Sequence, residues 1–341
     1  MLKLKLYFED LSNDILMEIF DYLYGQHIIL AFSQLKSRYN LLCVRYSNYH
    51  IDASDYCTFN KKKEFDRLLH LIDSKHICSL TFTRERWIQH IFTKSLFSLC
   101  SLTFFNVNNS IIIKEFLQKL PSPHHLHYLS LNFTWSYDAD IQDMIRTIFK
   151  LPNLRRLEWW SYWVEESFGI VDDPSLSLEH FSIDCNESYH FLQILPFMPN
   201  LITLKLSYKF DSFDLISVQA NSLSKLKSLQ MNDVYTYDQV YYMFQLCPHV
   251  KIFKLQHNAS NCSQPMTKAT DWEHLLSPMK FLREKDININ EIRDINIVNS
   301  LEYETEFWVQ RNLKVIVYDD PETCSTTFRI KNNPNIPDNK Q

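Results

Sequence analysis

A six-residue pattern recurs along most of this chain: an apolar residue, two variable residues, an apolar residue, one variable residue and a final apolar residue. Its copies start 22 to 32 residues apart, and one of them is degenerate because Lys285 takes its middle apolar position. A period of this size is typical of chains that stack one small structural unit on the next. The copies begin at Ile77, Leu99, Leu126, Leu154, Leu178, Leu201, Leu226, Val250, Leu282 and Leu313.

Each copy of the pattern predicts a short strand, because its last two apolar residues alternate with a variable one and therefore point to the same face. The segments between copies predict helices. Residues 112–120, 141–148 and 240–247 carry apolar side chains at helical spacing. Pro121, Pro152 and Pro248 follow such segments, and proline cannot continue a helix. The sequence thus predicts an α/β chain with one strand and one helix per repeat.

The hexapeptides resemble the leucine-rich repeat, over residues 76–320 and about ten repeats. The resemblance implies an open solenoid with a parallel sheet on its concave face and helices on its convex face. One departure is that the asparagine which bonds the turn backbone in many such repeats is not at a fixed place here. Residues 321–341 hold several proline breaks and few apolar residues, so we expect a disordered tail.

The first fifty residues lack the repeat and instead predict three helices, with Ser12 as a cap for the first. Residues 8–23 and 31–42 resemble the two halves of an F-box, apart from Ser12, where that family usually has proline, and Tyr39, near its usual tryptophan. Residues 51–75 are expected to form a linker and a first helix. Three helices in so short a segment make a poor core alone, so we expect a partner to complete it.

The F-box resemblance implies a non-catalytic substrate receptor of a cullin–RING, SCF-type ubiquitin ligase. The helices would dock on a Skp-family adaptor, and the repeats would hold an unknown target protein for ubiquitination. One apolar face of the first helix can serve its own bundle while the other meets the adaptor. The residues expected at the adaptor are Leu11, Ile15, Leu16, Ile19, Phe20 and Leu23.

The outward positions of neighbouring strands lie side by side, so they are the expected target-binding surface. Their mixture of charges and aromatic rings suits a protein partner better than a polyanion. The alternative places the target on the helical face, the linker or the tail. The expected target-binding residues are Tyr128, Arg156, Glu158, Trp160, His180, Asp184, Lys205, Lys254 and Gln256.

Composition excludes several classes of function. The chain has two glycines in 341 residues, so no phosphate-binding glycine loop and no nucleophile elbow can be built, and we expect neither catalysis nor a cofactor. The net charge of −5 makes no case for nucleic acid or an anionic membrane. Eight scattered cysteines without C-x-x-C indicate reduced thiols and a cytoplasmic or nuclear protein.

Alternatives remain at three places. The alternative to the F-box interpretation is that the N-terminal helices are the cap of an interaction scaffold that has no link to a ubiquitin ligase. His124, His125 and His127 could bind zinc, although exposed histidines in a turn are the simpler interpretation. Cys247 beside His249 suggests a thiol nucleophile, but its place on an apolar helical stripe favours core packing.

Overall fold

The computed structural model divides into two compact units. The first holds residues 1–134 and 151–154, and the second holds residues 135–150 and 155–341. The residues that the structure describes are 8–33, 35, 37–46, 48–53, 70–83, 88, 96–107, 109–121, 123–133, 141–161, 173–185, 189–208, 223–232, 236–258, 268–292, 303, 305–320 and 325–332.

The first unit begins with a short 3-10 helix η1 (Phe8–Asp10) and three helices, α1 (Asn13–Asp21), α2 (Gly25–Phe32) and α3 (Ser37–Arg45), where the sequence predicts helices. The Ser12 hydroxyl caps α1 by accepting a hydrogen bond from the Ile15 amide at 3.3 Å. Aromatic rings fill the space between the helices, with the Phe20 and Phe32 centroids 5.0 Å apart. The identity of these helices as an F-box stays a prediction.

Strand β1 (Tyr49–Asp52) follows soon after α3 and pairs in parallel with β2 (Ile77–Phe82). A linker is expected from residue 51 onward, and this boundary is wrong for residues 51 and 52, which belong to β1. The strand was missed because it lacks the hexapeptide, although Tyr49 and Ile51 are both buried. The sheet of this unit runs β1-β2-β3-β4, with β3 (Ser101–Phe105) and β4 (Tyr128–Phe133).

The other elements of the first unit connect these strands. They are the 3-10 helices η4 (Ser74–His76) and η5 (Pro123–His125) and the helix α6 (Ser110–Gln118). Helix α6 confirms the helix predicted within 112–120. Most of the expected linker, residues 54–69, lies outside the described residues.

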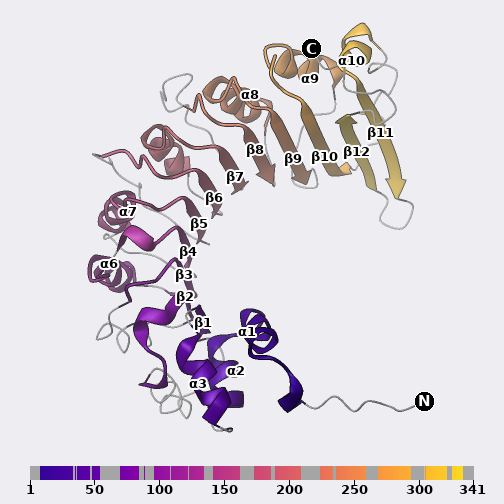
Figure 1. Cartoon of the computed structure of the whole chain (residues 1–341). Helices are drawn as coiled ribbons and strands as arrows, with labels where there is room; N and C mark the ends of the chain where they lie inside the picture. The colour runs from indigo at the N-terminus through magenta and orange to yellow at the C-terminus, as the bar shows by residue number, and fades with distance from the viewer. Residues whose placement is uncertain are drawn as a thin grey trace, which may run out of the picture. The chain divides into compact units, whose positions relative to one another are not determined.

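The second unit stacks strands in parallel from β5 to β10 (Figure 1). Corresponding residues of the hexapeptides face each other, so Leu157, Phe181, Leu204, Leu229 and Phe253 form one buried row. A mixed α/β fold with a mostly parallel sheet, as the repeats predict, is confirmed. The strands are β5 (Arg156–Ser161), β6 (His180–Cys185), β7 (Thr203–Tyr208), β8 (Ser228–Asn232), β9 (Ile252–Asn258) and β10 (Glu284–Ile292).

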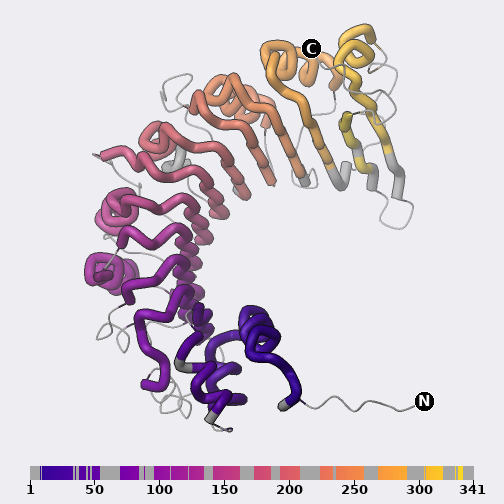
Figure 2. Tube along the Cα trace, viewed as in Figure 1, coloured from indigo at the N-terminus to yellow at the C-terminus, as the bar shows by residue number. Residues whose placement is uncertain are grey.

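The helical elements that the structure describes in this unit lie on one side of the sheet, and none of them covers the outward side of the strands (Figures 1 and 2). Two of them, α7 and α8, confirm the helices predicted within 141–148 and 240–247. The helical elements are α7 (Ile141–Phe149), η6 (Tyr189–Phe197), α8 (Tyr237–Leu246), α9 (Ala269–Leu276) and α10 (Glu306–Gln310).

The C-terminal end of the sheet departs from the prediction. Strand β12 (Ser325–Asn332) lies between β10 and β11 (Leu313–Asp320) and is antiparallel to both. The expected tail disorder is therefore wrong for residues 325–332, and the tenth hexapeptide does not join the parallel stack. Alternation explains the strand: Ile330 is buried, while Arg329 faces the other side and pairs with Asp286 at 2.9 Å. Residues 321–324 and 333–341 lie outside the described residues.

Two asparagines do occupy equivalent turn positions, contrary to the sequence analysis. The Asn153 amide donates to the His124 carbonyl at 2.6 Å, and the Asn200 amide donates to the Leu176 carbonyl at 2.6 Å. Each asparagine directly precedes the first leucine of a hexapeptide and bonds to the preceding turn. Asn312 precedes Leu313 in the same way, but the other seven hexapeptides have a different residue at this position, so the sequence shows no fixed asparagine.

Candidate protein-binding face

The outward face of strands β5 to β8 contains a hollow of about 260 Å³. A small residue, Ser182 on β6, lies between longer side chains on the neighbouring strands, because Glu158, Ser182, Lys205 and Gln230 are in register. The hollow is therefore a direct result of side-chain size at one outward position of successive repeats. It is lined by Arg156, Glu158, Trp160, His180, Phe181, Ser182, Thr203, Lys205 and Gln230.

An ion pair forms one wall of the hollow. Arg156 and Glu158 are two residues apart on β5 and so share a face. The Arg156 guanidinium donates to Glu158 Oε1 from Nε at 3.0 Å and from Nη2 at 2.6 Å. The Glu158 side chain is only 16% exposed, whereas that of Arg156 is 58% exposed. The pair thus presents the arginine to solvent and holds the carboxylate against the sheet.

An aromatic ring and a cation complete the hollow. Lys205 Nζ lies 5.9 Å from the centroid of the Trp160 ring, which is a cation–π distance. Trp160 is half-buried, while its neighbour Trp159 points inward and is 2% exposed. A half-buried tryptophan beside an exposed arginine is a combination enriched where proteins bind proteins.

The structure brings together five of the nine residues expected to bind the target: Arg156, Glu158, Trp160, His180 and Lys205. The other four do not line this hollow. Asp184 is in register with Trp160 one strand away, and Lys254 and Gln256 lie on β9. Lys254 Nζ lies 3.5 Å from Oε1 of Glu284, the first residue of the neighbouring strand β10. Tyr128 belongs to the first unit.

Thr203 and Gln230 also line the hollow, and the sequence analysis did not select them. Both occupy outward strand positions, so the alternation that selected Lys205 could have found them. They were passed over because a neutral polar residue on an exposed strand face carries no signal of its own.

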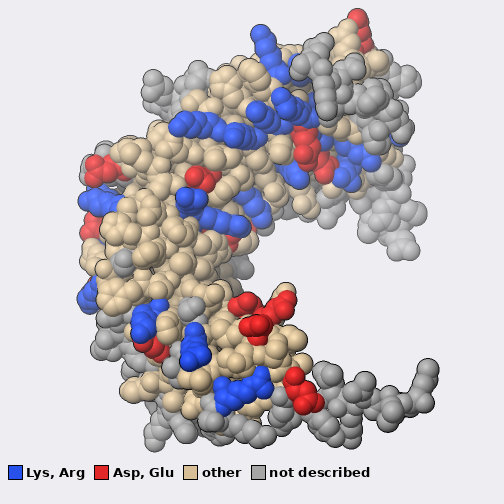
Figure 3. All heavy atoms as spheres, viewed as in Figure 1, with Lys and Arg blue, Asp and Glu red and all other residues tan. Residues whose placement is uncertain are grey.

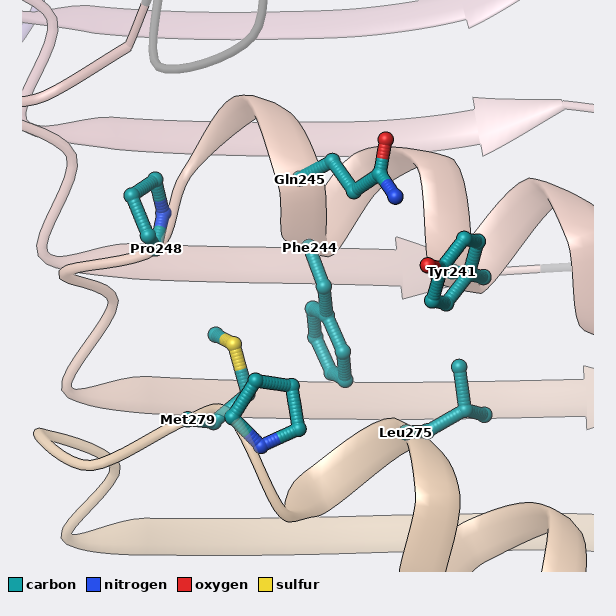
Figure 4. A pocket seen from close by; sticks show the side chains of 7 residues that line it. Tyr241, Phe244, Gln245, Pro248, Leu275 and Met279 are labelled. Atoms are coloured by element: carbon teal, nitrogen blue, oxygen red, sulfur yellow. The ribbon is translucent and has the colours of Figure 1, made fainter.

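A second, apolar pocket of about 420 Å³ lies on the helical side of the same unit, between α8 and α9 (Figure 4). Phe244, Leu275 and Met279 are its buried lining residues, and Tyr241 and Gln245 supply a hydroxyl and an amide. The remaining lining residues are Pro248 and Pro278. This pocket is where a target docked on the helical face would find apolar contact.

The six residues expected at the adaptor divide between two faces of the helical bundle. Leu16 and Phe20 are fully buried in the core of the first unit, so they cannot touch a partner directly. Ile15 is 46% exposed, and Leu11, Ile19 and Leu23 are half-buried. The expected division of α1 into a core face and an outer face is present, with Ile15 and Ile19 on the outer one.

Other apolar side chains of the helical segment are exposed as well and were not selected from the sequence. Tyr22 at the end of α1 is 84% exposed and Leu30 on α2 is 61% exposed. Their exposure is known only once the packing of the helices is known. In the sequence, each belongs to an apolar segment that is equally consistent with a buried position.

Helix α2 packs directly on strand β1. The Gln26 side chain donates to the Asp52 carbonyl at 3.0 Å and accepts from the Asp52 amide at 3.2 Å. Gly25 lies so close to Tyr49 and Ile51 that a Cβ there would meet both side chains at 2.8 Å. The helices therefore cover the first strand of the sheet, as the cap of a repeat stack would.

The metal and nucleophile alternatives gain no support from the geometry. The His127 ring Nδ1 lies 3.1 Å from the Asn153 carbonyl, and no three His, Cys, Asp or Glu residues in the described part of the chain are grouped to hold a metal ion. Cys247 is fully buried, its thiol bonds the Met243 carbonyl at 2.7 Å, and burial raises its pKa strongly. A thiol in that setting packs as an apolar group.

Among the described helices, none combines the length and apolar character that crossing a membrane requires.

Comparison with known proteins finds likenesses among solved structures. No protein-family model matches the sequence, and no curated protein matches it significantly. Among solved structures, the chain is similar to internalin C2 of Listeria monocytogenes, with 13% identity and a TM-score of 0.27. That match covers 64% of this chain and 82% of the internalin chain.

Proposed function

We propose that this protein is a non-catalytic substrate receptor. Its strand face in the second unit would hold a target protein, and its N-terminal helices would bind a Skp-family adaptor of a cullin–RING ubiquitin ligase. The role is binding alone: holding a target near the charged ubiquitin carrier raises the effective concentration of the reacting groups. A cytoplasmic or nuclear location accords with this role.

The observation that carries the target-binding part is the hollow over Ser182. It combines a half-buried indole, two cations and a shielded carboxylate on a rigid sheet. A partner residue that covers Trp160 and Lys205 would exclude water from both, which is how a few contacts come to dominate an interface. The backbone of the strands is already paired, so little ordering is needed on this side.

The adaptor part is supported by the outer face of α1. Ile15 and Tyr22 are exposed and Ile19 is half-buried, seven residues or fewer apart on one helix. Exposed apolar side chains gathered in one small segment are typical of surfaces that a partner covers.

The second candidate is an interaction scaffold without any ligase link. One observation favours it: α2 is docked on β1 through Gln26 and Gly25, so the helices already have a structural role as a cap. The two candidates differ in what covers the outer face of α1, which a binding experiment can decide.

The adaptor test uses the full chain and a purified Skp-family adaptor in isothermal titration calorimetry. The variant Ile15→Asp should abolish binding, because it places a carboxylate in the apolar contact. The matched control is Leu71→Asp, the same kind of change at a side chain that is 53% exposed and lies outside α1, α2 and α3. If the folded wild-type chain does not bind at micromolar concentration, the scaffold is the better proposal.

The target test starts from candidates found by proximity labelling, each then measured as a purified protein. The variant Arg156→Ala/Glu158→Ala/Trp160→Ala should weaken binding at least tenfold, roughly the effect of losing one interface hot spot. The control variant Tyr241→Ala/Gln245→Ala alters the helical-side pocket instead. Loss of binding in the control with full binding by the triple variant would move the target to the helices.

A further inference from the structure

A row of basic residues crosses the start of three consecutive strands in the second unit. The turn just before β8 carries Lys227, the turn before β9 carries Lys251, and the turn before β10 carries Arg283. Their backbones are linked, because the Lys251 amide donates to the Lys227 carbonyl and the Arg283 amide donates to the Lys251 carbonyl, both at 2.8 Å. We call these three residues the basic ladder; Figure 3 shows a row of Lys and Arg over this part of the unit.

Two more cations flank the basic ladder. Lys225 is two residues before Lys227, and its Nζ donates to Asn200 Oδ1 at 2.5 Å. Lys280 is three residues before Arg283 and is exposed, as are Lys225, Lys227 and Arg283, while Lys251 is half-buried. The repeat thus brings five cations from three separate turns to the end of the sheet where the strands begin.

The charge of the basic ladder is not neutralised by the carboxylates that the structure describes. Within the described ranges, none of the five cations is within ion-pair distance of an Asp or Glu. Glu284, next to Arg283, points to the strand face and pairs with Lys254 instead. The residue at the same turn position before β7 is the neutral Ile202, and the one before β6 is Glu179, which is therefore two strands away from Lys227.

We propose that the basic ladder is a second docking surface and that its ligand is an acidic peptide segment of a partner protein. The backbones of neighbouring ladder residues are about 4.8 Å apart, as in any sheet, so the three backbone positions span about 10 Å, the length of roughly three residues of extended peptide. A short run of Asp or Glu therefore matches it. This surface lies at the end of the sheet where the strands begin, and none of its five cations lines the hollow over Ser182.

A peptide fits this surface better than a nucleic acid does. Nucleic-acid affinity depends on neutralising many phosphates and on stacking bases. Here the cations lie where three strands begin, which is a short stretch for a nucleic acid. The chain as a whole carries a charge of −5, which repels a long polyanion. The ring next to the ladder, Phe281, is engaged by His249 with centroids 5.1 Å apart.

The experiment measures fluorescence anisotropy of a labelled peptide of six glutamates, with a six-glutamine peptide as the uncharged probe, against the full chain. Wild type should bind the acidic peptide and lose affinity as NaCl rises from about 50 to 300 mM, because exposed charges are screened. Lys227→Gln/Lys251→Gln/Arg283→Gln should weaken binding about tenfold, as expected for three exposed ion pairs.

The matched control is Lys119→Gln/Lys150→Gln/Lys268→Gln, which makes the same change of net charge at exposed lysines outside the turns that carry the ladder. It should bind within about twofold of wild type, since only distant, screened charges change. Lys227→Arg/Lys251→Arg/Arg283→Lys keeps the charge and should keep binding, which separates charge loss from misfolding.

Three results would overturn the proposal. They are no binding of the acidic peptide at millimolar concentration, equal weakening in the control variant, or tighter ladder-dependent binding of a single-stranded oligonucleotide with six phosphates. The last result would assign the ladder to nucleic acid.

Discussion

Replacing Leu204 by alanine tests the buried row that holds the second unit together. Leu204 on β7 is completely buried and lies in register between Phe181 and Leu229. Its neighbour Lys205 faces outward over Trp160. The two adjacent residues therefore report on opposite faces of one strand, and Lys205→Ala is the natural control.

The magnitude follows from burial. Leucine to alanine removes three carbons, and each buried CH₂ contributes about 0.8 kcal/mol, which gives about 2.4 kcal/mol from transfer alone. Phe181 and Leu229 on the neighbouring strands limit how far the site can collapse, so a cavity remains. The cavity raises the expected loss of free energy of unfolding to about 3–5 kcal/mol. Lys205→Ala loses a cation–π contact between two half-buried side chains and should cost about 1 kcal/mol, well below the loss for Leu204→Ala.

Urea unfolding followed by tryptophan fluorescence suits the measurement. Trp159, Trp272 and Trp308 are all buried in the second unit, so their emission follows the unfolding of that unit. The free energies of unfolding of wild type and both variants are compared at equal slope, since a change of slope would indicate a changed unfolding reaction. Equal losses for Leu204→Ala and Lys205→Ala would refute the inward–outward alternation of β7 and, with it, the register of the repeats.

Two further outcomes are expected. Gly25→Ala should lower the free energy of unfolding of the first unit by about 1–3 kcal/mol, because the new Cβ would lie 2.8 Å from side-chain carbons of Tyr49 and Ile51. An unchanged midpoint of thermal unfolding would contradict the packing of α2 on β1. Burial raises the pKa of the Cys43 thiol to about 11 and raises the pKa of the Cys247 thiol strongly. Because the reactive thiolate forms only as pH rises toward such values, iodoacetamide at pH 8 should label both cysteines at least 100-fold more slowly in the folded chain than in urea. Peptide mass spectrometry measures the two labelling rates, and equal rates would contradict the burial of these cysteines.

The parallel core of the fold was predictable because it depends on residues that repeat. Leu157, Phe181 and Leu204 occupy the same position of successive hexapeptides, and the sheet places them in register. Strand β1 was not predictable in this way, because Tyr49 and Ile51 are buried by α2 and not by a repeat of their own. Nor was β12, whose alternating residues lie in a polar segment that becomes a strand only where β10 and β11 offer unpaired edges.

The candidate site was predictable to a similar extent. Outward alternation places Arg156, Glu158 and Trp160 on one face, and the structure adds which neighbours approach them, such as Lys205 from two strands away. The basic ladder was missed for a different reason. Its members occupy turn positions treated as variable, and a net charge of −5 conceals a local group of cations.

The place of β12 has a consequence for how the chain is made. Strand β12 is synthesised after β10 and β11 and is inserted between them, so the backbone groups of β10 that pair with β12 lack that partner until residues 325–332 have been synthesised. A message that stops early, for instance at Asp320, would leave β10 and β11 without the strand between them. Unpaired strand edges recruit other chains, so we expect such truncated products to aggregate or to be cleared by quality control.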